Sequence, residues 1–562
     1  MPIFNKMETR CLSSLAKVFP DQDLNEPPFD RGSALLNETY SFQVAFRATK
    51  EASHAMKHVQ VHAESGLGEM VSVRLVGLVP SELPIYGDHD DRILRGTPGL
   101  YPDPLFPIDA TEGVAVLPHQ WRSVWITVEP VEPIFAGLYP IRVIFASESG
   151  DTLAEEKFEL ELIPAYLPKQ TLVHTEWFHT DCLATYYQVE VFSEAHWSII
   201  EAFIRSAVCR GMNMLLTPLF TPPLDMKVGG ERTTVQLVDV YKKGRNYTFG
   251  FERLKRWVEL CDKCGVWYFE FSHLFTQWGA KHAPKIMAEE NGRLTQIFGW
   301  ETDAAGDEYG EFLDQFLPSL VCFIKEHDLE KRSYFHVSDE PYLDHVSGYS
   351  RASERLARHL SGFPIIDALS NYEFYEKGII KNPITPIDHI EPFLENGVRN
   401  LWTYYCCAQY KSVANRFFCF PSSRNRIIGM QMFKYQIAGF LHWGYNFWYS
   451  QYSLRVIDPY RTTDADVAFP SGDAFAVYPG ANGQPVESIR LAVFYEALQD
   501  MRALQLLEEL IGREETLKML EENLEQELTF RNFPTDTDWL LACKEKMNRK
   551  IVEAIRRQSV ST

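Results

Sequence analysis

The sequence has little cysteine, no long apolar run and fewer basic than acidic residues, and each shortage excludes a class of protein. Its 562 residues include 10 cysteines without framework spacing, as expected of free thiols in a reducing compartment. No segment offers the ~18 uninterrupted apolar residues of a membrane span, and the N-terminus lacks a signal-peptide core. A net charge of −21 opposes binding to nucleic acid or anionic lipid. We therefore expect a cytoplasmic protein whose partner is neither nucleic acid nor a membrane; its oligomeric state stays open.

Metal-binding motifs are also scarce. Cys261 and Cys264 form the single CxxC of the chain, and no second pair completes a zinc site. The 16 histidines form neither an HxH nor an HExxH motif. We predict no metal and no cofactor, and we place the two cysteines on the last turn of a helix that Gly265 ends.

The N-terminal part of the chain has the pattern of short strands. A chain of this length exceeds the ~250 residues at which a single core stops growing, so two domains and a tail are expected. Apolar and polar residues alternate, between turn residues, in segments 39–48, 70–78, 122–131, 138–147 and 157–165. This spacing predicts an antiparallel β-sandwich. Pro164 and Pro168 mark a linker, so the first domain is residues 1–168.

Beyond residue 168, strands alternate with helices. The expected strands are segments 171–181, 212–220, 266–275, 332–341, 363–369, 399–407, 439–449 and 473–480. Eight βα alternations predict a (β/α)8 TIM-type barrel over residues 169–510, enlarged by insertions at 218–250 and 278–305. The charged residues 511–562 are expected to form a C-terminal helical segment packed on the barrel.

The active site of such a barrel lies at the carboxyl ends of its strands. The strongest candidates are Asp339 and Glu340, which follow the apolar strand YFHV directly. Two neighbouring carboxylates repel, so one pKa rises, and a carboxyl group with a raised pKa can protonate a glycosidic oxygen near neutral pH. Taken alone, however, an Asp-Glu dipeptide is common and usually lies in a solvated loop.

A retaining glycosidase ordinarily needs a second carboxylate as nucleophile, ~5 Å from the acid. The strand HWGYNFWY offers none, which leaves Glu176 and Glu270 as candidates. An adjacent acidic pair also suits substrate assistance, in which the 2-acetamido oxygen of the sugar attacks its own anomeric carbon. One carboxylate then stabilises the oxazolinium ion while its neighbour protonates the leaving group.

Several segments together resemble one known family. They are the opening ETRCLSSLAKVFPD, the strand end FHVSDEP, the aromatic strand HWGYNFWY and the ending SGDAFAVYPG with PVESIRLAVFYEALQDMRAL. Over residues 7 to about 510 the chain is similar to glycoside hydrolase family 123, the retaining β-N-acetylgalactosaminidases, and to its uncharacterised relatives. The resemblance implies that Asp339 stabilises the acetamido group and that Glu340 is the acid/base.

Other residues at the strand ends are candidates for substrate binding. Trp443 could stack on the sugar and Asn446 could bind its hydroxyls, while Tyr404 could donate to the acetamido oxygen and Trp402 could wall the acetyl pocket, although only one of the last two is expected to face inward. The remaining candidates of the pocket and its rim are Tyr445, His273, Trp278, His179, Asp181 and Tyr478.

Three hypotheses follow. The first is an exo-glycosidase that removes terminal β-linked N-acetylgalactosamine from small oligosaccharides or glycosides by substrate assistance. The second is a glycosidase of the same fold with another sugar specificity, which uses Glu176 or Glu270 as nucleophile. The third is a carbohydrate-binding protein without activity. Turnover of acetamido sugars alone, turnover of plain sugars, and binding without turnover distinguish the three.

Overall fold

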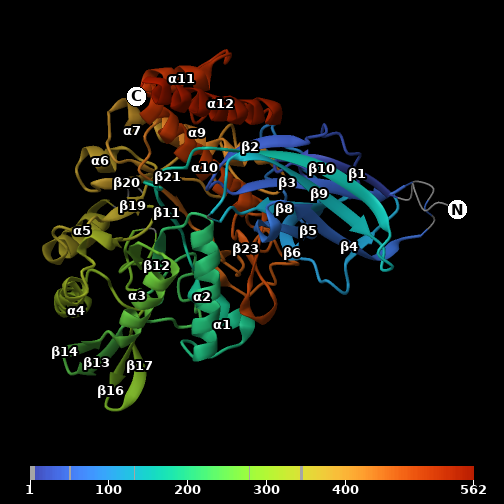
Figure 1. Ribbon diagram of the computed structural model, residues 1–562. Helices are drawn as coiled ribbons and strands as arrows, with labels where there is room; N and C mark the ends of the chain where they lie inside the picture. Colours follow the sequence, from blue (N-terminus) through green and yellow to red (C-terminus); the bar gives the residue numbers. More distant parts are fainter. Residues whose placement is uncertain are drawn as a thin grey trace.

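A computed structural model describes residues 7–49, 52, 54–131, 133–277, 279–341 and 346–561. Two five-stranded sheets face each other in the N-terminal region (Figure 1). The first has the order β1 (Met7–Ser13), β3 (Tyr40–Ala48), β8 (Arg122–Val128), β5 (Val71–Ser81), β6 (Gly99–Pro107). The second has the order β2 (Arg31–Leu35), β10 (Thr152–Ile163), β9 (Gly137–Ala146), β4 (Met56–Ser65), β7 (Val114–Val116).

A separate apolar core lies between these sheets. Phe42 of β3 stacks on Phe158 of β10, with ring centroids 4.0 Å apart. All five predicted strands form. The prediction of a purely antiparallel sandwich is wrong at one edge, because β10 pairs with β2 in parallel. Strands β1, β2, β4, β6 and β7 were not anticipated from the sequence.

The second region contains parallel strands in two sheets. One has the order β11 (Val173–Glu176), β22 (Gly439–His442), β21 (Trp402–Tyr404), β20 (Asn382–Pro386), β19 (Ile366–Ala368). The other has the order β12 (Met214–Thr217), β15 (Tyr268–Phe271), β18 (Ser333–Phe335). A bridge between Phe335 and Ile365 and a hydrogen bond from the Asn213 amide to the His174 carbonyl (3.1 Å) link the sheets. No continuous ladder joins them within the described residues, so this is a curled-sheet region and the closed barrel is not confirmed.

Two of the sequence-based strand assignments need correction. Segment 473–480, expected as the eighth barrel strand, contains β23 (Val477–Pro479), which pairs antiparallel with β24 (Pro485–Glu487) outside the parallel sheets. The true eighth parallel strand is β20, which contains Pro383 and Pro386. Proline removes a ladder donor and normally argues against a central strand, which is why this segment was missed.

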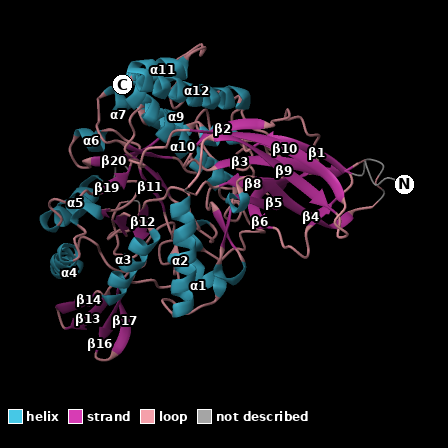
Figure 2. Cartoon of the chain, viewed as in Figure 1, coloured by secondary structure: helices cyan, strands magenta, loops and turns pink. Residues whose placement is uncertain are grey.

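Helices surround the parallel sheets (Figure 2). They are α1 (Thr180–Tyr187), α2 (Glu194–Cys209), α3 (Glu252–Cys264), α4 (Asp307–Glu326), α5 (Val346–His359), α6 (Glu373–Glu376), α7 (Glu391–Glu395), α8 (Ser422–Arg426), α9 (Ile428–Lys434) and α10 (Ile489–Ile511). Serine side chains cap the N-termini of α2 and α10. The Ser193 hydroxyl accepts a hydrogen bond from the His196 amide, and the Ser488 hydroxyl accepts one from the Leu491 amide. As predicted, α3 ends at Gly265 (φ 94°), and Cys261 and Cys264 are buried on its last turns.

The two insertions fold together, which the sequence pattern did not indicate. They form a four-stranded sheet of the order β14 (Asn246–Gly250), β13 (Asp239–Lys243), β16 (Ile286–Glu290), β17 (Arg293–Phe298). In Figure 1 this sheet projects from the side of the region opposite the C-terminal helices.

The C-terminal segment is helical, as expected, with α11 (Arg513–Glu521) and α12 (Thr537–Ser561). Helix α12 packs on α10 and also on the sandwich, where the Ser33 hydroxyl donates to Glu545 (2.7 Å). A buried ion pair between Arg490 of α10 and Asp103 of β6 (2.8 Å) further joins the sandwich to the second region. The domain limits at residues 168 and 510 stay a prediction. Within the described chain, no helix combines the length and apolar character that crossing a membrane requires.

Candidate active site

A cavity of about 170 Å³ lies at the carboxyl ends of the parallel strands. Its wall comes from the residues that follow β11, β12, β15, β18, β19, β21 and β22, or end them. The lining residues are Trp177, His179, Leu224, Asp225, Gln277, Asp339, Glu340, Ala368, Tyr404, Cys406, Cys407, Leu441, Trp443, Gln451, Tyr452 and Phe469. Polar groups therefore converge in a largely apolar hollow, as in sites for small ligands.

Asp339 and Glu340 both line this cavity, four and five residues beyond the end of β18. Gln277 donates from Nε2 to Oδ2 of Asp339 (2.6 Å), and the Tyr404 hydroxyl donates to Oε1 of Glu340 (2.8 Å). Glu340 has φ 45°, in the left-handed region that a residue with a side chain rarely adopts. Such strain persists only where the surroundings hold it, and it is concentrated at functional sites.

Burial raises the pKa of both Asp339 and Glu340, which favours their protonated forms. Burial, and next the Glu340 carboxylate, raise the pKa of Asp339 to about 8. Burial also raises the pKa of Glu340, against the lowering effect of the Tyr404 hydrogen bond. Because the two groups titrate together, the retained proton belongs to the pair. The pair can thus supply one proton and one negative charge near neutral pH.

A buried charge cluster lies beside the pair. His336 contacts Asp367 through Nδ1 (3.2 Å) and Glu270 through Nε2 (2.7 Å). Burial disfavours its charged form, but these hydrogen bonds outweigh burial and raise the pKa of His336 to about 10. His336, His273 and Asp367 have potential ligand atoms within 4.8 Å of one another.

An aromatic wall faces the cavity. The Trp443 indole donates to Oδ2 of the buried Asp473 (2.9 Å) and meets Phe469 edge-on, 5.5 Å between centroids. His179 also lines the cavity. Arg232 donates to its Nδ1 (3.1 Å), so its Nε2 carries the proton given to the Trp443 carbonyl (3.1 Å). Burial, and next Arg232, lower the pKa of His179 to about 3, so the imidazole is neutral.

Asp225 is a third carboxyl group in the cavity, and the sequence reading missed it. Its amide donates to Oε1 of Gln277 (2.5 Å), which turns the Gln277 NH₂ group toward Asp339. Its Oδ2 accepts from the Tyr452 amide (3.0 Å), and burial raises its pKa to about 6. Asp225 lies in an irregular insertion, and the loop that contacts it is 227 positions away in sequence. No local pattern in the sequence marks that contact.

Glu176 and Glu270 do not line the cavity, and both are fully buried in polar contacts. Arg416 donates hydrogen bonds to both carboxylate oxygens of Glu176, at 2.7 and 2.9 Å. Burial would raise the pKa of Glu176, but Arg416 outweighs it and holds that pKa far below its usual range. Glu270 accepts from Thr175, Trp177 and His336. Neither carboxylate is free to attack a sugar, so both are structural.

Replacing Arg416 by methionine is expected to lower the free energy of unfolding by about 3–5 kcal/mol, because it leaves the Glu176 charge buried and unpaired. Denaturant titration measures this loss. The matched control is the double variant Glu176→Leu/Arg416→Met, which removes both charges and should recover most of it. An Arg416→Met variant as stable as the wild type would contradict this assignment of Glu176.

Several of the predicted binding residues lie elsewhere. Tyr445 and Tyr478 are fully buried, and their hydroxyls donate to the Phe203 carbonyl and to Asp103. Asn446 uses its amide group to hold the backbone of His179. Strand β22 ends at His442, so Tyr445 and Asn446 lie beyond the strand end that lines the cavity, and Tyr478 belongs to β23, which lies outside the parallel sheets.

The candidates Trp402, Asp181 and His273 are buried and do not line the cavity either. Trp402 faces inward together with Tyr404, since residues two apart in a strand share a face, and it covers Gly439 beneath the cavity. The expectation that one of the two faces outward is therefore wrong. Asp181 holds Arg232 in a buried pair (2.7 Å), and His273 stacks on His336 (4.1 Å). Trp278 lies outside the described residues.

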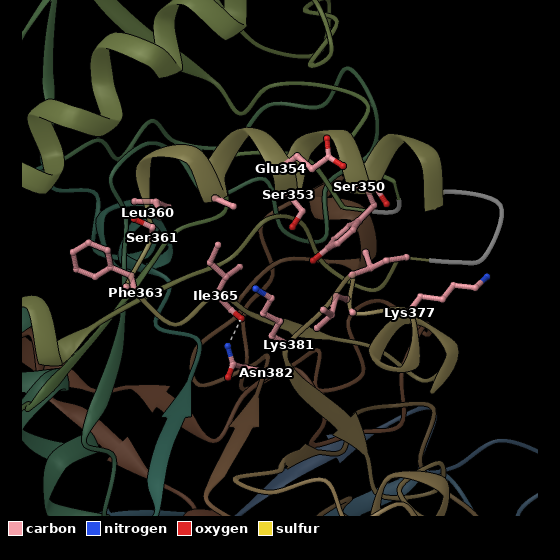
Figure 3. Close-up of a pocket in the computed structure, with 16 residues that line it drawn as sticks. Ser350, Ser353, Glu354, Leu360, Ser361, Phe363, Ile365, Lys377, Lys381 and Asn382 are labelled. Carbon is pink, nitrogen blue, oxygen red and sulfur yellow. Dashed lines mark hydrogen bonds between the residues drawn. The ribbon is translucent and has the colours of Figure 1, made fainter.

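A larger hollow of about 550 Å³ lies between α5 and the segment around Lys381 (Figure 3). Its polar side chains are serines, Glu354, Lys377, Lys381 and Asn382, and it contains no pair of neighbouring carboxyl groups. The acidic pair therefore identifies the smaller cavity as the candidate active site.

Comparison with known proteins points to one family of glycoside hydrolases. A family model described as the glycoside hydrolase 123 catalytic domain matches residues 177–507. A family 123 glycoside hydrolase from Clostridium perfringens, solved in work on glycolipid glycan hydrolysis, superposes with a TM-score of 0.75 at 13% identity, covering 99% of this chain and 100% of that one. At that identity the likeness shows the fold alone.

Weaker structural matches include a Parabacteroides merdae β-glucuronidase, with a TM-score of 0.31, 11% identity and coverage of 88% and 51%. Another is the endo-β-1,4-mannanase of Thermotoga petrophila, with a TM-score of 0.34, 11% identity and coverage of 60% and 78%. Both scores are too low to indicate a shared fold. A comparison with curated protein sequences gave no match.

Proposed function

Since the chain belongs to glycoside hydrolase family 123, we propose that it removes terminal β-linked N-acetylgalactosamine by substrate-assisted catalysis with retention. The observation that carries this proposal is the adjacent, buried pair Asp339 and Glu340, in which each carboxyl group has its own hydrogen-bond donor. The cavity volume of about 170 Å³ suits one sugar ring, in keeping with a small glycoside or oligosaccharide as substrate. A cytoplasmic location stays a prediction.

The roles follow from charge and hydrogen bonding. Asp339, oriented by Gln277, accepts from the acetamido N–H and stabilises the positive charge of the oxazolinium ion. Glu340, held by Tyr404, gives its proton to the glycosidic oxygen. The same carboxylate then takes a proton from the water that opens the oxazolinium ring, so the anomeric configuration is retained. Trp443 offers its face to the apolar side of the sugar.

The proposal predicts the pH dependence of the reaction. A carboxyl pair that keeps one proton up to about pH 8, the raised pKa of Asp339, loses its acid above that pH. We expect kcat/KM to fall above pH 8, by about tenfold per pH unit in the limit of one lost proton. Initial rates from pH 5 to 10 measure this limb. A Glu340→Gln variant should lack it, and a wild-type rate that stays flat to pH 10 would contradict the assignment.

The substrate is tested with 4-nitrophenyl β-N-acetylgalactosaminide, β-N-acetylglucosaminide and β-galactoside. Hydrolysis of the first, with little of the second and none of the third, supports the proposal. Equal rates on both acetamido sugars would contradict the galactose specificity. Binding of these glycosides without turnover would favour a carbohydrate-binding protein.

One observation keeps a second mechanism open. Asp225 lines the cavity, so a carboxylate other than Glu176 or Glu270 is available as a direct nucleophile. With a pKa of about 6 it is mostly ionised at neutral pH, as a nucleophile must be. This mechanism needs no acetamido group. It predicts hydrolysis of the plain β-galactoside and loss of that activity in Asp225→Asn.

A further inference from the structure

A second cavity, of about 350 Å³, lies between α5 and the loop that follows β15. We call it the arginine cavity, because Lys281, Arg351, Arg355 and Arg358 all line it. Only two acidic side chains, Asp303 and Glu354, stand against these four cations. Asp303 already accepts from the Ala305 amide (2.9 Å). In a chain with a net charge of −21, a hollow lined by excess positive charge is a local exception.

The guanidinium group of Arg355 packs against a glycine of α4. A Cβ atom placed on Gly310, inside α4, would lie 1.8 Å from Nη1 of Arg355 and 2.4 Å from its Cζ. The guanidinium group therefore rests directly on the backbone of α4. Glycine inside a helix lowers helix stability, and here its missing side chain makes the room that Arg355 occupies.

One nitrogen of Arg355 is buried without an acceptor. Its Nη1 lies against Gly310 of α4 and has no hydrogen-bond partner. Buried donors in folded proteins are almost always paired, so this nitrogen is a local exception, and other atoms of the Arg355 side chain line the cavity. No ion pair joins Lys281, Arg351 or Arg358 to an acidic group among the described residues. Arg351, Arg355 and Arg358 lie four and three positions apart, so they share one face of α5.

The arginine cavity adjoins the candidate active site. Gln277, which holds Asp339, lines the active-site cavity, while Gly279, Ala280 and Lys281 line the arginine cavity. Consecutive Cα atoms are ~3.8 Å apart, so those of Gln277 and Gly279 lie within ~7.6 Å. This is about the length of one sugar unit. One short segment of chain therefore lines both cavities.

We propose that the arginine cavity binds an oxyanion, a carboxylate or a sulfate ester, on the leaving-group side of the substrate. This inference rests on the proposed glycosidase function. Guanidinium groups suit it because their N–H donors match the paired oxygens of carboxylates and sulfates. Arg355 binds the anion directly, and the other three cations attract it electrostatically. The enzyme then prefers acidic over neutral oligosaccharides.

The test compares two disaccharides in which β-N-acetylgalactosamine is linked to glucuronic acid or to glucose. A third arm carries a sulfate ester on the glucose and tells the two oxyanions apart. We expect wild-type kcat/KM to be higher on at least one acidic substrate by about tenfold, the effect of one charge-assisted hydrogen bond. Arg355→Gln should remove this preference and leave the neutral substrate unaffected. Equal rates on all three would overturn the proposal.

Two further variants test whether the preference for acidic substrates depends on the position of the Arg355 guanidinium group and not simply on the total positive charge. Gly310→Ala displaces the guanidinium group without removing a charge, so it should also abolish the preference. Lys381→Gln removes one positive charge from the neighbouring cavity (Figure 3) and should keep the preference. Retention of the preference in both Arg355→Gln and Gly310→Ala would overturn the role of Arg355.

Binding of inorganic sulfate separates this inference from the proposed function. If no glycoside is hydrolysed, the proposed function fails, but sulfate should still raise the unfolding temperature of the wild type and not of Arg355→Gln. Absence of that shift would overturn the anion site. A shift together with equal rates on acidic and neutral substrates would indicate a site for free anions, and it would overturn the substrate assignment.

Discussion

Glu340→Gln is expected to lower kcat on an alkyl β-N-acetylgalactosaminide by about 10²–10⁴, the usual contribution of a general acid/base. Glutamine keeps the shape of the side chain and can still accept from Tyr404, but it can neither give up an acidic proton nor carry a negative charge. Steady-state rates with a methyl glycoside measure the loss.

The leaving group provides the control for that variant. 4-Nitrophenolate leaves with little protonation, so the bond-breaking step of 4-nitrophenyl β-N-acetylgalactosaminide should suffer far less from Glu340→Gln than that of the methyl glycoside. Pre-steady-state rates compare the two. An equal loss on both substrates would mean that Glu340 is not the acid.

Asp339→Asn is expected to lower kcat by about 10²–10³, as when one group that stabilises transition-state charge is removed. Asparagine can still accept from Gln277, but it carries no negative charge to face the oxazolinium ion. The matched control is Asp225→Asn, which alters the other carboxyl group near Gln277. A larger loss of kcat in Asp225→Asn than in Asp339→Asn would favour the direct nucleophile.

The Asp339→Asn variant should also be more stable to unfolding than the wild type at neutral pH. The pKa of Asp339 is about 8 in the fold and near 4 in the unfolded chain. A carboxyl group of this kind contributes most to stability at low pH, and that contribution is lost as the pH rises toward 8. Asparagine removes the penalty, so a stability gain with lost activity would show that the pair is strained for function.

Local sequence patterns identified much of this architecture and the centre of the site. Strands such as β3 and β12 alternate or are uniformly apolar, and α10 carries a serine cap, so each could be assigned from its own residues. Asp339 and Glu340 were found because an apolar strand runs directly into them. These features depend only on neighbours in sequence.

Features made by distant contacts could not be predicted in this way. Strand β20 is central, yet its two prolines conceal it. Asp225 reaches the cavity through a loop whose course depends on the segment around Tyr452. The sequence pattern places Tyr478 at the end of a strand, but its hydroxyl donates a hydrogen bond to Asp103 of the sandwich. Each case depends on tertiary packing that no local period records.

The central claim is that the acetamido oxygen of the substrate is the nucleophile, and stepwise fluorination of that group tests it most directly. Each fluorine withdraws electron density from the oxygen without changing the sugar ring. The proposal predicts that kcat/KM falls steadily from the N-acetyl through the fluoroacetyl and difluoroacetyl to the trifluoroacetyl galactosaminide. A rate independent of fluorination, above all with hydrolysis of the plain β-galactoside, would contradict it and would favour attack by Asp225.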